Sequence, residues 1–589
     1  MLSEFTCEPC TYRSKTTTMS NREYPVTDLY SRCNSIALPY IRSIIIEETI
    51  NLSRRYFFDS FEHSSADLLI KSLLGENNDR VLSQAFQYHF IDNDFKRIKY
   101  EEIQAALGKI NEKQDSRKDN GVYYTPADVV YFITSNCIRA SYGLINGDNL
   151  SSTDYGGVPI RSFCLEKTVL EPTCGTGEFL LAALEIKLSL WESSGYAFEA
   201  CTLRQIVATL HGNDINTEST TIAKIRLFLA VLRKCGLELA CGIIDVFDMM
   251  FTNYDFIDLP ESFDSKFDII LGNPPYVEDH KYSNILGEKY GNIYCNVLNN
   301  SSKHLTDKGV IGFIIPLSYV STPRMKKIRD RLYSVLPKQF IFNFADRPDC
   351  LFTCVHQKLS ILIGCPGEKK ITYTSNYQYW YRSERSKLFE RLSIVKNEFH
   401  RDDCILKLGT SNDKNIYKKV TDKSRCVSVY ENSRVGSESV YINRRETFWI
   451  KAFRTPINHP EFKVFSYKTH EEADYCYCLV NSSLFWWYWI CTSDCWHVSK
   501  SLNDFMAPVI SNFSTVFKLA DALATKLEAT KVYVGTKQTE YEYKHNACID
   551  EIHAIDDYVN SLYGLSEEES DYIKNFAYRY RISGGAETK

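Results

Sequence analysis

The residues with the clearest chemical potential form one short segment, Asn273-Pro274-Pro275-Tyr276, which follows the apolar run Phe267–Leu271. The two prolines fix the backbone and remove two N–H donors. The Asn273 side-chain oxygen and the Pro274 carbonyl then remain as neighbouring hydrogen-bond acceptors, which suit a planar NH2 group with two donors. Tyr276 adds a flat ring that can stack on a base. Taken alone, the segment is also compatible with a rigid turn around a buried aromatic residue.

A glycine-rich turn lies about a hundred residues earlier, in Glu171-Pro-Thr173-Cys174-Gly175-Thr-Gly177. Gly175 and Gly177 allow the backbone to approach a ligand closely. Glu171 ends an apolar run, where it can bind a polar or cationic group at the crevice of a sheet. The turn lacks the G-x-x-x-x-G-K-[ST] pattern of a phosphate-binding loop. An ordinary turn between a strand and a helix is the alternative interpretation.

Two further acids follow apolar runs between these segments. Asp214 follows Ile206–Gly212, at the position where a ribose diol is usually bound, and Asp245 follows Ala240–Ile244. Each acid alone is compatible with a loop residue or a helix cap. With Glu171 they form a series of three acids at successive predicted strand ends, which indicates a binding site along one edge of a sheet.

The elements that must position these residues alternate between strand and helix patterns from Gly121 to about Ile363. This alternation predicts an α/β fold with a mostly parallel sheet. The predicted helices are Gly177–Leu190 and Ser219–Cys235. The predicted strands are Lys167–Glu171, Ile206–Gly212, Ala240–Ile244, Phe267–Leu271, Val310–Pro316, Phe340–Phe344 and Leu359–Ile363.

The 589 residues divide into four predicted parts: a helical region over 1–115, the strand–helix domain over 116–365, an aromatic-rich mixed domain over 366–535, and a helical tail over 536–589. Ser566 and Glu569 predict a capping box at the start of one tail helix. No apolar stretch reaches the roughly 18 residues of a membrane span. With its 20 cysteines read as thiols, the chain is expected in a reducing, cytoplasmic compartment without a membrane partner.

Together, the motifs resemble those of the γ-class S-adenosylmethionine-dependent DNA adenine-N6 methyltransferases, in particular the large single-chain TaqI- and Eco57I-like enzymes of restriction–modification systems. The resemblance is strong from Gly121 to about Gly364. It implies a Rossmann-like class I methyltransferase domain, with helices on both faces of the sheet, followed by a mixed α/β target-recognition domain. It also implies S-adenosyl-L-methionine as cofactor, double-stranded DNA as substrate, and a separate restriction endonuclease or other defence-system subunits as partners.

The resemblance implies roles for individual residues. The catalytic motif corresponds to Asn273, Pro274, Pro275 and Tyr276, and Gly291–Tyr294 resembles the motif that follows it. Phe352 is the candidate for a second aromatic residue against the flipped base, with a core phenylalanine as the equal alternative. The implied cofactor-binding residues are Thr125 at the methionine end, Glu171, Thr173, Gly175 and Gly177 in the glycine-rich motif, Asp214 at the ribose, Asp245 at the adenine amine, and Phe247 packed on the cofactor.

The net charge of −5 argues weakly against a nucleic-acid partner, but the charge is unevenly distributed. Residues 366–468 contain 21 basic and 12 acidic residues, whereas 469–589 contain 10 basic and 18 acidic residues. Basic residues interleaved with aromatic ones suit phosphate and groove contacts, and a solvated face is the alternative. The candidate DNA contacts are Arg444, Arg445, Trp449, Lys451, Arg454 and Lys500.

Several other functions remain as alternatives. An Asn-Pro-Pro-Tyr site also suits methylation of an RNA base or of a glutamine amide in a protein, and an inactive DNA-specificity subunit is a third possibility. Neither a fused nuclease nor cytosine-C5 chemistry is expected. Two Cys/His trios have spacing that could suit zinc, but buried thiols in strands are the preferred interpretation, so no metal is expected. The trios are Cys350, Cys354, His356 and Cys491, Cys495, His497.

Overall fold

A computed structural model describes most of the chain after residue 124. The described residues are 104, 125–145, 154–236, 239–240, 242–282, 288–352, 356–422, 426–427, 436–457, 459–535 and 540–584. The predicted helical region over 1–115 therefore lies, apart from Gln104, outside the described residues. Among the residues that are described, no helix combines the length and the apolar composition needed to cross a membrane.

A nine-stranded sheet forms the centre of the larger lobe, in the order β3-β2-β1-β4-β5-β7-β6-β8-β9. The strands from β3 to β5 are parallel, and β7 is antiparallel to both of its neighbours. The predicted α/β fold with a mostly parallel sheet is confirmed. The strands are β1 Val169–Glu171, β2 Leu210–Asn213, β3 Phe251–Thr252, β4 Phe267–Gly272, β5 Leu305–Pro316, β6 Lys338–Phe344, β7 Leu359–Cys365, β8 Ile371–Gln378 and β9 Val395–Asn397.

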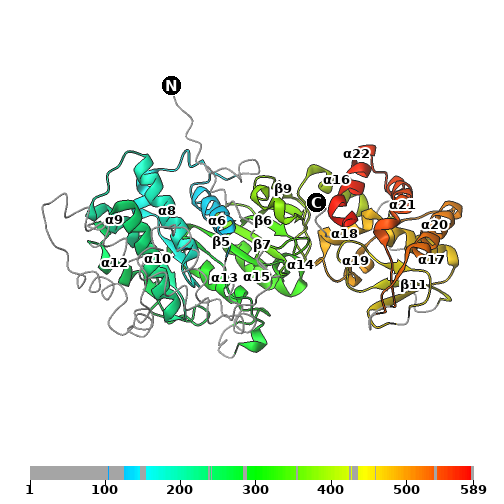
Figure 1. The fold of residues 1–589 in the computed structure, drawn as a ribbon, viewed down its shortest axis with the longest axis horizontal. Helices are drawn as coiled ribbons and strands as arrows, with labels where there is room; N and C mark the ends of the chain where they lie inside the picture. Colours follow the sequence, from blue (N-terminus) through cyan, green and yellow to red (C-terminus); the bar gives the residue numbers. More distant parts are fainter. Residues whose placement is uncertain are drawn as a thin grey trace, which may run out of the picture.

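Helices pack against this sheet in two groups (Figure 1). One group contains α6, α8 and α10, with α6 against β4, β5 and β7 and α8 against β1 and β2; in the other, α13 packs on β5 and α15 packs on α13. A Cβ at Gly312 would overlap the Cys137 sulfur, so this glycine allows α6 to lie directly on β5. The bounds are α6 Ala127–Ala140, α7 Ile160–Glu166, α8 Glu178–Ser193, α9 Ala200–Ala208, α10 Thr217–Cys235, α12 Ile244–Met249, α13 Tyr294–Lys303, α14 Ser318–Ser321 and α15 Lys326–Val335.

The prediction of a strand over Ala240–Ile244 is wrong. Helix α12 begins at Ile244, and the third parallel strand, β3, is the short pair Phe251–Thr252 that follows this helix. Asp245 occupies the first turn of α12, where a negative charge is favoured by the helix dipole. The apolar run therefore leads into a helix, and Asp245 precedes the third strand instead of following it.

The predicted domain boundary at residue 365 also differs from the observed sheet. Strand β8 pairs in parallel with β6, and β9 pairs with β8, so the sheet continues to Asn397. Along β8, four of the eight residues are partly buried and largely alternate with the four buried ones, as in a strand near the edge of a sheet. This period-two pattern lies immediately after the Pro366-Gly367 turn, which has the composition of a linker.

The second lobe is mainly helical and carries a small antiparallel sheet, β12-β11-β13 (Figure 1). Helix α18 is buried along its whole length, and the chain's last helices pack around it. The predicted capping box of Ser566 and Glu569 is present at the start of α22. The elements are α16 Ser411–Val420, β11 Glu438–Asn443, β12 Ala452–Phe453, β13 Phe462–Tyr467, α17 His470–Asn481, α18 Ser483–Thr492, α19 Ser499–Asp504, α20 Ser514–Thr530, α21 Ile549–Leu562, α22 Glu567–Asn575 and α23 Tyr578–Ile582.

The described C-terminal end returns to the junction of the two lobes (Figure 1). There the Tyr381 hydroxyl donates a hydrogen bond of 3.0 Å to the Arg579 carbonyl, and Arg579 also forms an ion pair with Glu384. These contacts join the segment after β8 to the last helix. The tail is therefore part of the lobe junction, and its acidic helices do not form an independent unit.

Candidate active site

The carboxyl ends of β1, β2 and β4 lie side by side at one edge of the sheet. Glu171 on β1 is in register with Gly212 on β2, and Leu170 is in register with Ile270 on β4. In open α/β sheets, ligands bind outside the carboxyl ends of the strands. The topology thus brings the glycine-rich turn, Asp214 and the Asn-Pro-Pro-Tyr segment to one edge, as expected from the sequence.

The glycine-rich turn adopts a backbone that favours glycine at two positions. Gly175 and Gly177 have φ values of 50° and 79°, in the left-handed region. A Cβ on Gly177 would lie 2.9 Å from the Ala223 Cβ on α10, whereas a Cβ on Gly175 would meet nothing within 4 Å. Gly177 therefore permits close helix packing, and the backbone at Gly175 borders open space where a ligand can approach.

Asp214 holds the glycine-rich turn in place. One carboxylate oxygen accepts a hydrogen bond of 2.8 Å from the Gly175 amide, and the other accepts one of 2.9 Å from the Asn216 amide. Burial raises the pKa of Asp214, and the two amides oppose that shift. Its neighbour Ile215 is 64% exposed, which is unusual for a large aliphatic residue. Ile215 could not be identified from the sequence, because an isoleucine beside an acid does not indicate a functional residue until its exposure is known.

Glu171 and Thr173 flank the same turn. The Glu171 carboxylate is buried and accepts a hydrogen bond of 3.0 Å from the Leu180 amide in the first turns of α8. Burial raises the pKa of Glu171 well above its usual range. The Thr173 hydroxyl is buried and has no hydrogen-bond partner within the described part of the chain. Glu171 thus fastens β1 to α8, and direct contact of either residue with a cofactor stays a prediction.

The position after β3 is occupied by Asp255 and not by Asp245. Asp245 forms an exposed ion pair of 2.6 Å with Arg204, and its side chain is 62% exposed. Asp255 lies three residues beyond β3 and is followed by the buried Phe256. Its carboxylate accepts hydrogen bonds from the Tyr282 hydroxyl at 2.7 Å and from the Ile257 amide at 3.0 Å. The acid expected at the third strand end is therefore Asp255.

The two predicted auxiliary phenylalanines are both buried. Phe247 is 1% exposed and packs edge-on against Phe228, with ring centroids 6.1 Å apart, so its ring is not available to pack on a cofactor. Phe352 is 2% exposed and belongs to the hydrophobic core. For Phe352 the alternative of a core residue agrees with the structure.

The Asn273 side chain is oriented by Thr125. The Asn273 amide nitrogen donates a hydrogen bond of 3.0 Å to the Thr125 hydroxyl, although the two residues are 148 positions apart. Thr125 is 4% exposed and directly precedes Pro126, the N-cap of α6. Because α6 lies on β5, the close packing at Gly312 also places Thr125 beside the end of β4. The predicted cofactor-binding threonine thus contacts the predicted catalytic amide.

Tyr276 is anchored at both its hydroxyl and its ring. Its hydroxyl donates a hydrogen bond of 2.9 Å to the Ile314 carbonyl on β5, and its ring lies edge-on to Tyr294, with centroids 6.3 Å apart. Tyr294 is the first residue of α13, and its own hydroxyl lies 2.9 Å from that of Ser318. The segment Gly291–Tyr294 thus begins a helix beside the Asn-Pro-Pro-Tyr segment, as expected.

The candidate DNA contacts fall into two groups. Trp449 is 9% exposed, and its indole N–H donates to the Arg581 carbonyl, so this ring belongs to the core. Arg454 pairs with the buried Asp474 at 2.9 Å, and Lys500 pairs with Asp403. These three residues have structural partners, which argues against their use as free DNA contacts. Arg444 and Arg445 are exposed and Lys451 is half-buried.

The second Cys/His trio lies on a helix and a turn, not in strands. Cys491 and Cys495 are buried free thiols, and their sulfurs lie near backbone carbonyls. His497 is exposed and pairs with Asp494. In the other trio, Cys350 is buried, and Cys354 is outside the described residues. No cluster that could hold a metal ion occurs among the residues that the structure places.

The part of the chain that contains this site is similar to a known protein family. Residues 208–348 match the family model of the Eco57I restriction-modification methylase. This part of the chain therefore resembles an Eco57I-type methylase domain. The match spans Asp214, Asp255 and the Asn-Pro-Pro-Tyr segment, and S-adenosyl-L-methionine is the cofactor of this type of methylase domain.

Two relatives share the methylase domain. The modification methylase CviBIII of Paramecium bursaria Chlorella virus NC1A is 25% identical over 210 residues, which are 35% of this chain and 45% of that protein. The type II methyltransferase M.PaeR7I of Pseudomonas aeruginosa is 28% identical over 160 residues, which are 25% of this chain and 27% of that protein. The chain thus spans less than half the length of either relative.

The fold is similar to that of one solved enzyme over nearly the whole chain. The Type IIL restriction-modification enzyme MmeI, solved in complex with DNA, aligns with a TM-score of 0.50 and 13% identity, covering 94% of this chain and 99% of that chain. At this identity the likeness concerns the fold alone. The similarity in fold therefore extends beyond the sheet-containing lobe to the second lobe.

Proposed function

We propose that the chain is a DNA methyltransferase that transfers the methyl group of S-adenosyl-L-methionine to N6 of an adenine flipped out of double-stranded DNA. The observation that carries the proposal is the Asn273 amide, held by Thr125 at the end of β4 beside the glycine-rich turn of β1. The Eco57I-type match over the same segment supports it. The relatives named modification methylase and type II methyltransferase support a restriction–modification role.

The residues at the strand ends fit the cofactor. A ligand can approach the backbone at Gly175, the buried Thr173 hydroxyl can supply a hydrogen bond, and Asp214 can accept hydrogen bonds from a ribose diol. The exposed Ile215 offers an apolar surface for a base, and Asp255 takes the role of the adenine-reading acid that the family pattern had assigned to Asp245. When bound, S-adenosyl-L-methionine supplies an electrophilic methyl group on its sulfonium.

The chain's own residues position the acceptor nitrogen. The amide nitrogen of Asn273 donates to Thr125, which orients the side-chain oxygen to accept an N6 hydrogen. The Pro274 carbonyl accepts the second hydrogen. Both bonds favour a more tetrahedral nitrogen with its lone pair directed at the methyl group, and positioning supplies most of the rate enhancement of such an in-line transfer. The partly exposed face of Tyr276 replaces part of the stacking lost when the base leaves the duplex.

The second lobe is the proposed DNA-binding part. Arg444 and Arg445 are exposed and directly follow β11, and both can reach phosphate oxygens without breaking a buried contact. Double-stranded DNA is accordingly the proposed substrate, and a separate restriction endonuclease is the proposed partner in the same system. The alternatives are methylation of an RNA base or a protein glutamine, and an inactive specificity subunit.

The test incubates the full chain with S-adenosyl-L-methionine labelled at the methyl group and, in parallel, plasmid DNA, total RNA or a protein extract. Label on DNA recovered as N6-methyladenine is expected. Asn273→Ala is expected to lower kcat by at least about 100-fold while retaining cofactor affinity, because it removes an interaction made in the transition state. Asn575→Ala, at an exposed position of α22, is the matched control and is expected to match the wild type.

Each other outcome identifies one alternative. Label on N4 of cytosine would retain DNA methylation and overturn the adenine assignment. Label confined to RNA or protein would overturn the DNA assignment. Cofactor binding without transfer to any of the three substrates would indicate an inactive subunit.

A further inference from the structure

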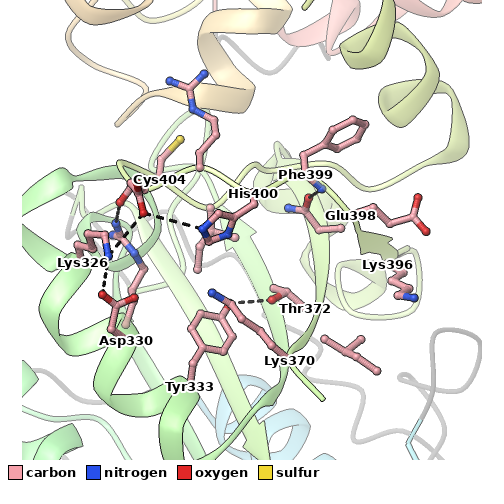
Figure 2. A pocket seen from close by; sticks show the side chains of 16 residues that line it. Lys326, Asp330, Tyr333, Lys370, Thr372, Lys396, Glu398, Phe399, His400 and Cys404 are labelled. Atoms are coloured by element: carbon pink, nitrogen blue, oxygen red, sulfur yellow. Dashed lines mark hydrogen bonds and ion pairs between the residues drawn. The ribbon is translucent and has the colours of Figure 1, made fainter.

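A cavity of about 320 Å³ lies away from the candidate active site, between α15, the start of β8 and the segment that follows β9 (Figure 2). Three strands, β5, β7 and β6, separate β8 from β4 in the sheet. At about 4.8 Å per strand, the cavity is displaced by roughly 19 Å along the sheet from the end of β4. It therefore belongs to a different part of the domain from the Asn-Pro-Pro-Tyr segment.

The acidic residues that line this cavity are all engaged by cations. Asp330 pairs with Lys326 at 2.6 Å, and Asp402 lies 3.5 Å from the same lysine. Glu398 pairs at 3.0 Å with Lys414, which comes from α16 and does not line the cavity. Each carboxylate of the lining therefore has a cationic partner.

Two of the lining cations, Arg329 and Lys370, form no ion pair with these acids among the described residues. Arg329 is buried, and its guanidinium donates to the backbone carbonyls of Tyr319, Thr322 and Asp402, each at 2.9 Å. Carbonyl groups satisfy its donors but carry no net charge to balance it. Lys370 forms no ion pair with a carboxylate in the described part of the chain, and its ammonium lies 4.0 Å from the centroid of the Tyr333 ring.

Burial lowers the pKa of Lys370, Asp330 opposes this shift, and the nearby Lys326 and Arg329 add to it. The three cations Lys326, Arg329 and Lys370 thus lie close enough together to act on one another. An anion placed there would be attracted by several groups at once.

Neutral hydrogen-bonding groups lie next to Lys370. The Tyr333 and Thr372 hydroxyls are 2.7 Å apart, and Figure 2 shows Lys370 approaching this pair from the start of β8. His400 lies across the opening, with its Nε2 3.8 Å from Asp402. An ammonium group with adjacent hydroxyls provides both charge and directional donors, the combination that proteins use to bind phosphate oxygens.

We propose that this cavity is a second, phosphate-binding site, in which Lys370 binds the anion together with the hydroxyls of Tyr333 and Thr372. Its volume lies at the lower end of the range for small-molecule pockets, which is about 300–1,000 Å³. The cavity thus accommodates a phosphate monoester up to the size of a mononucleotide. A phosphate of the DNA backbone has the same chemistry and is the second possible source of the group.

Binding to the full chain is measured by isothermal titration calorimetry with three probes at constant ionic strength: inorganic phosphate, adenosine monophosphate and a 20-base-pair DNA duplex. Lys370→Ala is expected to weaken binding of adenosine monophosphate by at least about tenfold, because a charged hydrogen bond of this kind contributes about 1.5–3 kcal/mol. Tyr333→Phe keeps the ring under Lys370 and is expected to weaken binding by a smaller factor.

Lys369→Ala is the matched control, because Lys369 is exposed, as Lys370 is, but does not line the cavity. Selective loss of adenosine monophosphate or phosphate binding on Lys370→Ala supports a free phosphate ligand. Selective loss of duplex affinity supports a DNA phosphate at the same site. Equal affinities of Lys370→Ala and Lys369→Ala for all three probes would overturn the proposal. Because the readout is binding, the result is independent of methyl transfer.

Discussion

The strand-end edge of the sheet and the second lobe differ in how well chemistry can be assigned from residue types. At the edge formed by β1, β2 and β4, residues far apart in the chain meet: Asp214 bonds the Gly175 amide, and Asn273 bonds Thr125. In the second lobe, residues with the composition of a DNA-binding surface separate into core and surface. Trp449 supports the last helix, while Arg445 stays exposed.

The difference has a physical cause. In a parallel sheet all carboxyl ends lie at one edge, so a polar residue that directly follows a strand is placed by the topology itself. A basic or aromatic residue in a mixed lobe has no such constraint. Arg454 is as basic as Arg445, but it is held by the buried Asp474, and only the packing of α17 against β12 reveals this.

The largest expected effect tests the claim that Trp449 is a core residue. Trp449→Ala removes an indole that packs under the Arg581 guanidinium, 4.1 Å from the ring, and that donates to the Arg581 carbonyl. Deleting a buried aromatic side chain costs about 3–5 kcal/mol of unfolding free energy. Urea denaturation of the full chain measures this change. Trp449→Phe is expected to recover part of the loss.

If Trp449 instead contacted DNA, Trp449→Ala would lower DNA affinity with unchanged unfolding free energy. That result would remove the distinction between core and surface residues in this lobe. Arg445→Ala in the same assay is the control, with an expected change within about 0.5 kcal/mol for an exposed position.

A smaller effect, about 100-fold in kcat, is expected from Thr125→Val. This change keeps the shape of the side chain but removes the acceptor of the Asn273 amide, so that the amide is free to rotate away from its productive orientation. A misplaced catalytic group costs about 100-fold. The affinity for S-adenosyl-L-methionine is expected to change less than kcat, which separates positioning of Asn273 from cofactor binding. Thr125→Ser restores the hydroxyl and is expected to restore most of the rate.

Much of the fold could be predicted because its signals are local. Strand β4 and helices α8 and α10 begin and end within three residues of their predicted bounds, since each is a single apolar or amphipathic run. The edge strand β3 could not be predicted, because it has two residues and depends on a neighbour: the Asn213 side chain accepts hydrogen bonds from the Thr252 hydroxyl and the Tyr254 amide. A contact between strands leaves no pattern in the sequence of either strand.

The same limit explains which parts of the site were missed. The Asn-Pro-Pro-Tyr segment and Asp214 follow strands that are visible in the sequence. Asp255 follows the strand that was not visible, so the role was assigned to Asp245 on the preceding helix. The hydrogen bond between Thr125 and Asn273 joins two segments through α6, and its existence depends on the packing of that helix at Gly312.

A pH dependence is expected from a buried acid of the second lobe. Glu446 is 4% exposed, and burial raises its pKa to about 8, while the Lys451 amide donates a hydrogen bond to its carboxylate. Because the unfolded chain has the lower pKa, the folded state binds the extra proton between about pH 4.5 and 8. Glu446 therefore stabilises the folded state at low pH, and this stabilisation is lost as the pH rises through 8.

Thermal unfolding between pH 5 and pH 9 measures this contribution. Glu446→Gln keeps the size of the side chain and cannot ionise, so it is expected to reduce the loss of stability by about 1.4 kcal/mol for each pH unit between pH 5 and pH 8. Parallel pH profiles of the two proteins would contradict the assignment of Glu446 as a buried, protonated acid. Glu461→Gln, at a half-exposed position directly before β13, is the control.

A change of about tenfold in cofactor affinity is expected at the third strand end. Asp255→Asn removes the charged acceptor beyond β3, and a hydrogen bond to a charged group contributes about 1.5–3 kcal/mol. Asp245→Asn changes only an exposed ion pair with Arg204 and is expected to leave the affinity unchanged. Calorimetric titration with S-adenosyl-L-methionine compares the two variants. The reverse ranking would return the role to Asp245.

The smallest effect is expected for the exposed arginines of the second lobe. Arg445→Ala is expected to weaken duplex binding only a few-fold and to reduce the slope of log affinity against log salt by about one, because one phosphate contact is lost. Arg445 also lies 3.6 Å from Glu461, an exposed pair that contributes little to stability. Arg454→Ala, in contrast, removes the arginine from the buried Asp474 and leaves only His470 near that carboxylate. It is therefore expected to lower the unfolding free energy and to weaken DNA binding only through that loss. An unchanged salt slope for Arg445→Ala would place the DNA elsewhere on this lobe, and exposure would then be no better a guide to the binding surface than composition.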